Sequence, residues 1–433
     1  MTSSEFVVIA SKTLPEQPDY VVWCPNEGYR DIVAVGTYSI AHGSTRSSCP
    51  GTDRNGSIYL YRLVKNTGDV VSGSSHDLVQ VASHRCSGGI FELSFIAPND
   101  DWNRDRPLLV ASLSNGSLAL YALRMANNDE KIGIFEIGSA FYGPNAQSST
   151  ARPMLLCHDF VADSSNRYSV ICGDNKGNIS LGSINFNTTL SDSSSPSNLD
   201  SMEVVSRWPG HVLPMTSGAS AEVWSVSFHP SDVNIIYSGG DDCALKAWDL
   251  RMDAANVGPG ASVKCHDGGV TEVTTMPRGG GNMMPGCENL IFTGSYDEAI
   301  RILDCRTLKV PIVQWDTGGG VWKLSFNCSA SCPHKRVALA AACMYNGYSI
   351  VDFDNLANRC CDSPNYWENT RTRSGLKLDT ESGNALLYGI DWKYDGSYGT
   401  KRQSRTETGE LLAGCTFYDK KLCVVERSPT SCR

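Results

Sequence analysis

The stretch SGGDDCALKAWDLR, residues 238–251, joins two glycines and two adjacent aspartates to a short apolar strand that ends in Trp-Asp. A second stretch, FTGSYDEAIRILDCR at residues 292–306, has the same order of small residues, turn and strand, so Asp242 and Asp297 are equivalent. Tight turns favour Asn, Asp and Gly because they need positive φ or a side chain that bonds its own backbone. Five more copies of this hairpin occur, with equivalent turn residues Asn55, Asn115, Lys176, Asn346 and Asp419.

Each hairpin is flanked by two further predicted strands. One precedes it, as in EVWSVSFHP at residues 222–230, and a less regular one follows it, as in PIVQWDTG at residues 311–318. Seven units of four strands are typical of an all-β, seven-bladed β-propeller with WD-type repeats, here one domain spanning residues 1–433. We expect residues 5–14 to supply the strand that the last blade lacks and so to close the ring. The expected blade cores are 19–63, 87–124, 153–184, 222–250, 269–306, 320–353 and 386–426.

Composition and charge restrict the classes of partner. Hydrophobic residues make up 41% of the chain and charged residues 19%, which is enough for a large buried core. The formal net charge of -9 argues against a direct nucleic-acid partner, because phosphate binding needs a basic face. The start of the chain has no basic flank and the sequence has no apolar span of about 18 residues, so we expect no membrane association and a cytoplasmic location. The 17 cysteines lie mostly singly in apolar runs, which is typical of reduced, buried thiols.

The turn aspartates have a structural interpretation. In WD repeats this aspartate bonds a histidine in the loop before the first strand of its blade, a role open to Asp242 with His211 and to Asp297 with His266. We place Asp419 in the same structural class. Asp241 differs, because the turn requires no carboxylate there and the equivalent residue of the next blade is Tyr296.

The first strands of the blades predict a ring of residues at one height. Aligning them on VWSVSF gives Asp19, Phe91, Leu156, Trp224, Thr271, Trp322 and Tyr388. Large rings at these positions either fill a tapering channel or, together with carboxylates, bind a cation at its mouth. The carboxylates expected near the same face are Asp241, Glu222, Asp267 and Glu272.

Signatures of catalysis are sparse. The chain contains no Gly-x-Ser-x-Gly, His-Glu-x-x-His, Walker or Gly-x-Gly-x-x-Gly motif. Ser75, His76 and Asp77 are adjacent and predicted to lie in a solvated loop, so they cannot form a triad. Cys328, Cys332 and His334 provide only half of a zinc site, and we predict neither a metal nor a cofactor. Since propellers are mostly interaction platforms, the residues alone favour a binding module.

Several stretches contain residues, in a specific order, that a general WD repeat does not require. They include TGSYDEAIRILDCRTLKVPI, GGGVWKLSF, LAAACMYNGYSI and LLAGCTFYDKKLCVVE, and the similarity runs from about Tyr20 to Glu426. In these stretches the chain resembles the WD-repeat diphthine methyl esterases of the diphthamide pathway. The resemblance implies a carboxylic ester hydrolase that removes the methyl ester from methylated diphthine on elongation factor 2. It also implies partnership with that factor and with other enzymes of the pathway. The substrate would carry a trimethylammonium group, which suits an aromatic and acidic mouth.

Candidate roles follow from predicted position. For activation of water we nominate Asp241 first, Glu222 and His211 next, and Glu298 last. The expected substrate walls are Trp224, Trp322, Tyr296, Tyr388 and Phe91. Cys343 is either a nucleophile or, as is commoner for a strand residue, a buried thiol. The alternative function is a non-catalytic WD-repeat scaffold or adaptor that binds a protein partner. The sequence departs from the WD pattern at Leu303, where tryptophan is usual.

Overall fold

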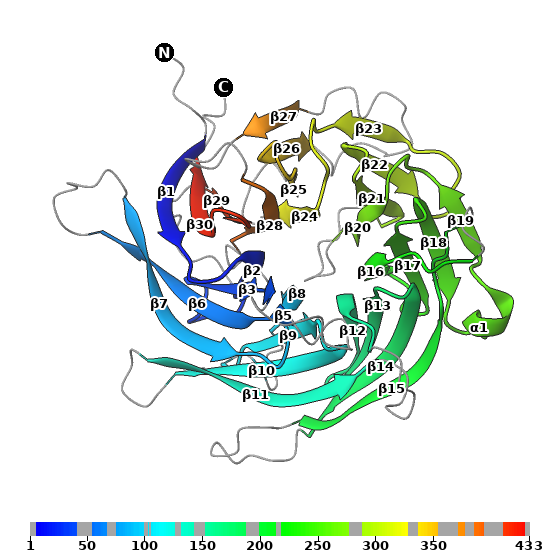
Figure 1. The fold of residues 1–433 in the computed structure, drawn as a ribbon, viewed down its shortest axis with the longest axis horizontal. Coiled ribbons are helices and arrows are strands. Elements are labelled where there is room, and N and C mark those ends of the chain that lie inside the picture. The colour runs from blue at the N-terminus through cyan, green and yellow to red at the C-terminus, as the bar shows by residue number, and fades with distance from the viewer. Residues whose placement is uncertain are drawn as a thin grey trace.

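The computed structural model forms a closed ring of β-sheets (Figure 1). It describes residues 6–40, 54–66, 75–98, 103, 105–125, 131–142, 152–187, 199–213, 218–276, 288–327, 337–353, 371–376, 385–393 and 410–428. Within these residues there are seven four-stranded antiparallel sheets arranged around one axis. The predicted fold, a seven-bladed all-β propeller, is therefore confirmed.

The first three blades follow one another along the chain. Blade one comprises β2 (Pro18–Trp23), β3 (Ile32–Thr37), β6 (Ser57–Lys65) and β7 (His76–Arg85), with a small hairpin of β4 (Ser39–Ile40) and β5 (Arg54–Asn55) inserted after β3. Blade two comprises β8 (Ile90–Phe95), β9 (Leu108–Leu113), β10 (Ser117–Met125) and β11 (Ile132–Phe141). Blade three comprises β12 (Leu155–Ser164), β13 (Arg167–Asp174), β14 (Asn178–Phe186) and β15 (Leu199–Pro209).

The remaining blades complete the ring. Blade four comprises β16 (Val223–Phe228), β17 (Ile235–Gly240), β18 (Ala244–Asp249) and β19 (Ala261–Lys264), with the short helix α1 (Ala254–Val257) before β19. Blade five comprises β20 (Val270–Thr275), β21 (Leu290–Ser295), β22 (Ala299–Asp304) and β23 (Val313–Asp316). Blade six comprises β24 (Lys323–Asn327), β25 (Val337–Ala342), β26 (Tyr348–Phe353) and β27 (Arg371–Leu376). Blade seven comprises β28 (Leu387–Trp392), β29 (Glu410–Thr416), β30 (Lys421–Arg427) and β1 (Phe6–Thr13).

The two ends of the chain meet in blade seven. Strand β1 pairs antiparallel with β30, from Phe6 opposite Arg427 to Thr13 opposite Lys421. Both described ends lie at this blade in Figure 1. The pairing covers the edge of β30, so the N-terminal strand closes the ring as predicted.

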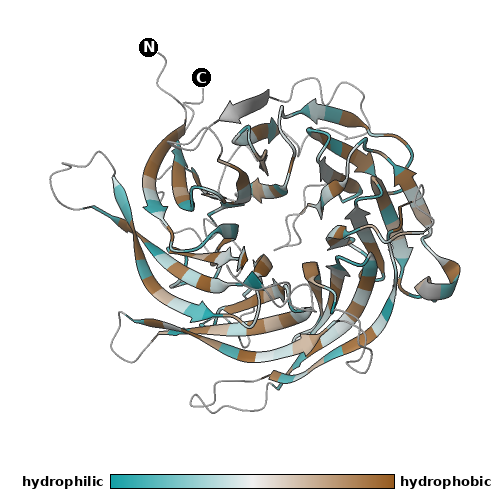
Figure 2. Ribbon diagram, in the orientation of Figure 1, coloured by the Kyte–Doolittle hydropathy of each residue, from teal (hydrophilic) through white to brown (hydrophobic). Residues whose placement is uncertain are grey.

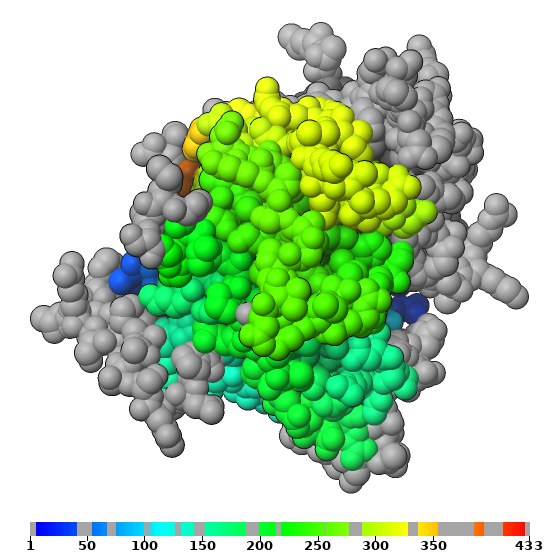
Figure 3. Space-filling view, turned by 90° about the vertical axis from the view of Figure 1, so that its right-hand side faces the viewer, coloured from blue at the N-terminus to red at the C-terminus, as the bar shows by residue number. Residues whose placement is uncertain are grey.

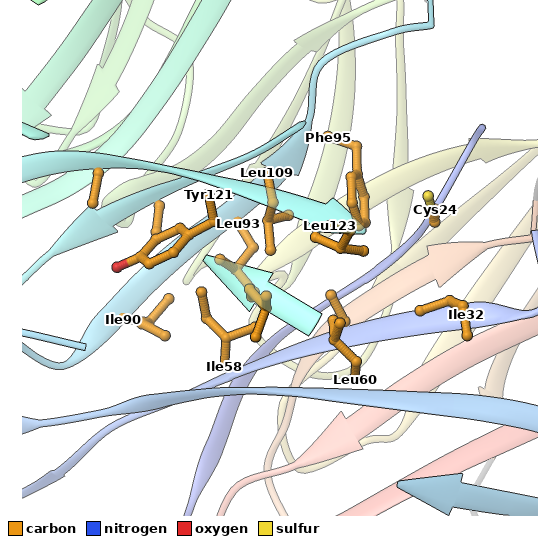
Figure 4. Packing of buried hydrophobic residues seen from close by; sticks show 14 of the residues in the cluster. Cys24, Ile32, Ile58, Leu60, Ile90, Leu93, Phe95, Leu109, Tyr121 and Leu123 are labelled. Carbon is orange, nitrogen blue, oxygen red and sulfur yellow. The ribbon is translucent and has the colours of Figure 1, made fainter. Parts of the chain in front are cut away.

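The hydrophobic core lies between neighbouring blades. Between blades one and two, Ile58 and Leu60 of β6 pack with Ile90 and Leu93 of β8 (Figure 4). The second strands are mostly buried, and four of them, β3, β9, β21 and β25, are buried along their whole length. The outer strands instead alternate between apolar and polar residues (Figure 2). Blades three to six lie together on the side of the molecule that Figure 3 shows.

The hairpin turns have the geometry that their residues suggest. In six of the seven hairpins the residue after the turn position has positive φ: Gly116, Gly177, Cys243, Glu298, Gly347 and Lys420. The side chain of Asp242 accepts the backbone N–H of Ala244 at 3.2 Å, and Asp297 accepts that of Ala299 at 3.2 Å. These bonds stabilise turns in which Cys243 and Glu298 adopt a conformation that favours glycine.

Three local expectations need correction or addition. The outer strand of blade six, β27, lies beyond the expected blade core of residues 320–353. His76 and Asp77 begin the outer strand β7 and do not lie in a loop, because β7 extends along β6 as far as Lys65. Helix α1, which the sequence did not predict, has four residues. Among the described residues, no helix has the length and apolar character needed to cross a membrane.

Candidate functional site

A β-bulge recurs at the start of the first strand in six blades. Each bulge leaves one residue out of the pairing register, namely Asp19, Phe91, Leu156, Trp224, Thr271 and Tyr388. In blade six, Trp322 directly precedes β24 and donates its backbone N–H to the carbonyl of Ala342 at 2.8 Å. Bulges redirect side chains at strand ends. These seven residues, here called the axial layer, are those that the sequence placed at one height.

Aromatic side chains of the axial layer contact further rings to form a continuous arc. Centroid distances are 5.0 Å for Trp322–Tyr388, 5.3 Å for Trp322–Trp224 and 5.9 Å for Trp322–Tyr296. The arc continues from Tyr388 through Phe417 at 5.4 Å, Tyr38 at 5.1 Å and Phe91 at 5.4 Å. We call these seven rings the aromatic arc; Tyr296 is 38% exposed and the other six are half-buried. All five predicted wall residues therefore belong to one contact network.

Tyr38 and Phe417 are members of the arc that the sequence did not reveal. Both residues directly follow a second strand, β3 or β29. The alignment of the repeats within this chain used only the first strands of the blades. Tyr38 also borders the insert of blade one, which interrupts the repeat spacing. A search for aromatic residues at the ends of second strands would have found both.

Two of the nominated carboxylates adjoin the arc. Trp224 donates its indole N–H to Asp241, with 2.6 Å between Nε1 and Oδ1. The backbone N–H of Asp241 bonds the carbonyl of Glu222 at 3.1 Å. Burial, followed by the charge of Asp241, raises the pKa of the Glu222 carboxyl. The charge of Asp241 therefore opposes ionisation of Glu222, and the two neighbouring acids suit this edge of the arc to a cation.

Asp19 is a third carboxylate of this region, and the sequence assigned it no role. It is 2% exposed, and among the described residues its carboxylate accepts no hydrogen bond. Burial raises its pKa well above the usual value. Its charge contributes to the raised pKa of Tyr38 and Tyr388, where burial is the larger cause. The sequence placed Asp19 in the axial layer but did not indicate that it is buried.

His211 is committed to the framework of blade four. It is fully buried, and its Nδ1 lies 2.7 Å from Asp242 while its Nε2 lies 2.8 Å from Ser238. Trp248 completes the network by donating to Ser238 at 2.9 Å. With both ring nitrogens occupied, His211 is not placed to activate water, contrary to its nomination as a base.

Blade five has a similar framework. His266 lies 3.1 Å from Asp297 and 2.8 Å from Thr293, and Leu303 stands where blade four has its tryptophan. In blade seven, by contrast, both carboxylate oxygens of Asp419 lack a hydrogen-bond partner among the described residues. Asp419 thus occupies the turn without the histidine bond that blades four and five contain.

Two other acids lie apart from the carboxylates beside Trp224. Glu298 accepts a hydrogen bond from the hydroxyl of Tyr345, an exposed residue of the blade six turn. This contact links two hairpin turns and does not involve the aromatic arc. Asp267 is exposed and donates its backbone N–H to Asp297 at 3.0 Å. Their positions argue against Glu298 as a base and against Asp267 as part of a cation site.

A buried ionic cluster lies one residue further along the first strands. Lys323 of blade six contacts Glu92 of blade two at 2.8 Å and Glu272 of blade five at 3.0 Å. Tyr20 of blade one donates to Glu92 at 3.1 Å. Burial raises the pKa of Glu272 to about 7, although Lys323 opposes this shift. Glu272 is therefore part of this buried cluster and does not add to the acidic edge.

Three further sequence candidates carry no site. Cys343 is fully buried within 3.3 Å of Ser349, and burial raises the pKa of its thiol to about 11, so it is not an activated nucleophile. Ser75 lies 2.9 Å from His76, but Asp77 bonds the backbone of Leu78 at 2.7 Å, so the three do not form a triad. Cys328, Cys332 and His334 lie outside the described residues.

The repeats, the closure and the axial layer together define a class of protein. Residues 203–249 match the family described as WD domain, G-beta repeat. The protein is a WD-repeat propeller whose first strands bring aromatic rings and carboxylates together at one end of the axis.

Comparison with known proteins specifies the relatives. The chain is 26% identical over 384 residues to "Diphthine methyltransferase" of Mus musculus, covering 87% of this chain and 67% of that protein. It is 27% identical over 413 residues to "Diphthine methyltransferase homolog" of Dictyostelium discoideum, covering 91% and 92%. The protein of that name from Saccharomyces cerevisiae is 25% identical over 397 residues, covering 84% and 91%. The chain is thus a homologue of the diphthine methyltransferases, which confirms the resemblance and implicates diphthamide biosynthesis.

Proposed function

We propose that this protein hydrolyses the methyl ester of methylated diphthine on elongation factor 2 in the cytoplasm. Water and ester would give methanol, a proton and the free carboxylate that the later amidation requires. The observation that carries the proposal is the aromatic arc with Asp241 and Glu222 at its edge. The homologues named for diphthine supply the choice of substrate.

Recognition would begin with the trimethylammonium group. This cation has no N–H to donate, so it is held by the faces of aromatic rings and by nearby negative charge. Trp322 contacts three other rings of the arc, and those rings remain partly exposed. Asp241 adds a carboxylate at the Trp224 end. The arc suits a quaternary ammonium better than a primary amine, because a primary amine has N–H donors for which aromatic faces provide poor acceptors.

Hydrolysis would use a carboxylate as general base. Trp224 fixes Oδ1 of Asp241, and among the described residues Oδ2 accepts no hydrogen bond, so Oδ2 is available to a water molecule. The water oxygen would attack the ester carbonyl carbon as its proton passes to Asp241. Methoxide would then leave and take up a proton to form methanol. Glu222, whose pKa is raised, is the second candidate for holding that proton.

The homologues' printed name specifies transfer of a methyl group, whereas we propose its removal. A sulfonium methyl donor would itself be a cation that aromatic rings attract, so cation binding does not distinguish the two reactions. The family resemblance favours removal, and a carboxylate free to accept a proton from water serves hydrolysis directly. An assay must therefore measure both the addition and the removal of the methyl group.

Elongation factor 2 is proposed as the protein partner. The chain carries a net charge of -9, and an acidic surface increases the association rate of a basic, RNA-binding partner. Association should then weaken as salt rises, because screening shortens the range of these charges.

The test uses purified protein and elongation factor 2 carrying methylated diphthine. We expect methanol release and the mass change for loss of one methyl ester, without added donor. Incorporation of labelled methyl from S-adenosylmethionine into the factor, without methanol release, would overturn the proposed direction. Stable binding of the factor with no turnover would favour the scaffold alternative instead.

A further inference from the structure

Arg54, in the insert of blade one, forms no ion pair with any acid among the described residues. It lies in β5, which pairs with β4 in the insert of blade one. Its backbone carbonyl accepts the N–H of Gly89 at 3.0 Å and the hydroxyl of Ser114 at 3.4 Å. These bonds attach the insert to blade two and fix the point from which the side chain extends.

The side chain of Arg54 begins beside a member of the arc. A methyl group built on Gly89 would lie 2.7 Å from Cβ of Tyr38 and 3.2 Å from Cβ of Arg54, so the two side chains flank this glycine. From there Arg54 reaches blade three, where Nη1 is 2.9 Å from the sulfur of Met154. Its charge also opposes the raised pKa of Glu222 on blade four.

The polar atoms of this guanidinium are poorly satisfied. Nε is buried and has no hydrogen-bond partner in the part of the chain that the structure describes, and a thioether sulfur is only a weak acceptor for Nη1. Among the described residues no carboxylate forms an ion pair with Arg54, although the chain as a whole is acidic. A buried donor of this kind has a large desolvation cost, which an anionic or strongly polar ligand would offset.

We propose that Arg54 binds the carboxyl group of an N-trimethylated amino acid, so that the arc and Arg54 together recognise a betaine. This inference rests on the proposed function and names the substrate class more closely. The guanidinium would hold the ester carbonyl oxygen before reaction and both carboxylate oxygens afterwards. During attack by water, the carbonyl π electrons move onto that oxygen, and Arg54 would stabilise the resulting oxyanion.

The consequence for binding is a preference for the acid over the ester. A charge-assisted pair with a carboxylate is stronger than a hydrogen bond to a neutral carbonyl, so the released acid should bind about tenfold more tightly. The product would then inhibit the reaction. A quaternary ammonium without a carboxyl group should bind through the arc alone.

The experiment measures the affinity of the full chain for three probes by calorimetry: choline, N,N,N-trimethylhistidine and its methyl ester. Wild type should prefer the free acid, and Arg54→Gln should lose about tenfold in affinity for it while its affinity for choline stays unchanged. Arg54→Lys should recover part of the preference for the free acid over the ester, since lysine keeps the positive charge but lacks the two parallel N–H donors of the guanidinium. Arg85→Gln is the matched control, because Arg85 lies in the same blade, is exposed and pairs with Glu16.

The outcomes separate the two proposals. Equal affinity of wild type and folded Arg54→Gln for trimethylhistidine would overturn the role of Arg54 while leaving the esterase proposal intact. Failure of wild type to bind any of the three probes would overturn the cation site, and the role of Arg54 with it. In the esterase assay, we expect Arg54→Gln to lower kcat more than it raises KM, because the oxyanion forms only during reaction.

Discussion

Trp224 holds Asp241 in place through a hydrogen bond of 2.6 Å between the indole Nε1 and one carboxylate oxygen. The bond joins the bulge of a first strand to the turn between the second and third strands of the same blade. The next residue, Asp242, bonds His211 and Lys246, which belong to the framework. Two adjacent aspartates in the turn of blade four therefore have separate tasks.

This division predicts opposite effects for two adjacent substitutions. Asp241→Asn should lower kcat/KM for ester hydrolysis by about 10²–10⁴-fold, as is typical for loss of a general base, with a change in unfolding free energy below about 1 kcal/mol. Asp242→Asn should instead lower the free energy of unfolding by about 2–4 kcal/mol, because it breaks a buried network around His211. Methanol release and urea denaturation measure the two quantities. Full activity in a folded Asp241→Asn protein would eliminate Asp241 as the base.

The position of Trp322 at the centre of the arc predicts a specific loss of cation binding. Trp322→Leu removes contacts with Trp224, Tyr296 and Tyr388 together, so affinity for choline should fall about tenfold. Trp315→Leu is the matched control, since Trp315 belongs to the outer strand β23 and packs on Phe353. Calorimetric titration gives the affinities. A similar loss in both variants would indicate general destabilisation and not a cation site.

Much of the fold follows from local sequence signals. The turn residues and the alternating strands repeat at each blade, and a missing strand at one end with a spare apolar run at the other indicates closure. The axial layer was also predictable, because the bulge falls at the same place in six first strands. Such features depend on residues close together in the chain.

The parts of the site that could not be predicted depend on contacts between blades. Lys323 neutralises Glu92 across 231 residues of sequence, and no local pattern pairs them. Tyr38 joins the arc from the edge of an insert, where the repeat alignment fails. The sequence predicted four carboxylates near one face, Asp241, Glu222, Asp267 and Glu272, whereas only Asp241 and Glu222 adjoin the aromatic arc.

Closure by the first strand predicts that its removal destabilises the whole ring. Deleting residues 1–13 would expose the backbone groups of β30 and uncover Arg427, whose guanidinium lies 5.4 Å from the ring of Phe6. We expect a lower thermal midpoint and aggregation through the open edge. Differential scanning calorimetry and light scattering measure these effects. Deleting only residues 1–5 is the control, because it leaves β1 intact. If the longer deletion kept the wild-type midpoint, closure would contribute little to stability.

The buried position of Glu272 predicts how stability changes with pH. Burial raises its pKa from the usual 4.5 to about 7 in the folded protein, against the attraction of Lys323 and with a contribution from Glu92. Between these two pH values the folded state therefore binds more protons than the unfolded state. The stability from this group is present below about pH 4.5 and is lost as pH rises to about 7. Glu272→Gln cannot titrate, so its free energy of unfolding relative to wild type should increase across that window and then level off.

Urea denaturation at pH 5, 6, 7 and 8 measures the difference, with Glu203→Gln on the outer strand β15 as the control. Parallel curves for wild type and Glu272→Gln would show that the carboxyl of Glu272 is ionised throughout, and the cluster would then be two ionised carboxylates sharing one lysine.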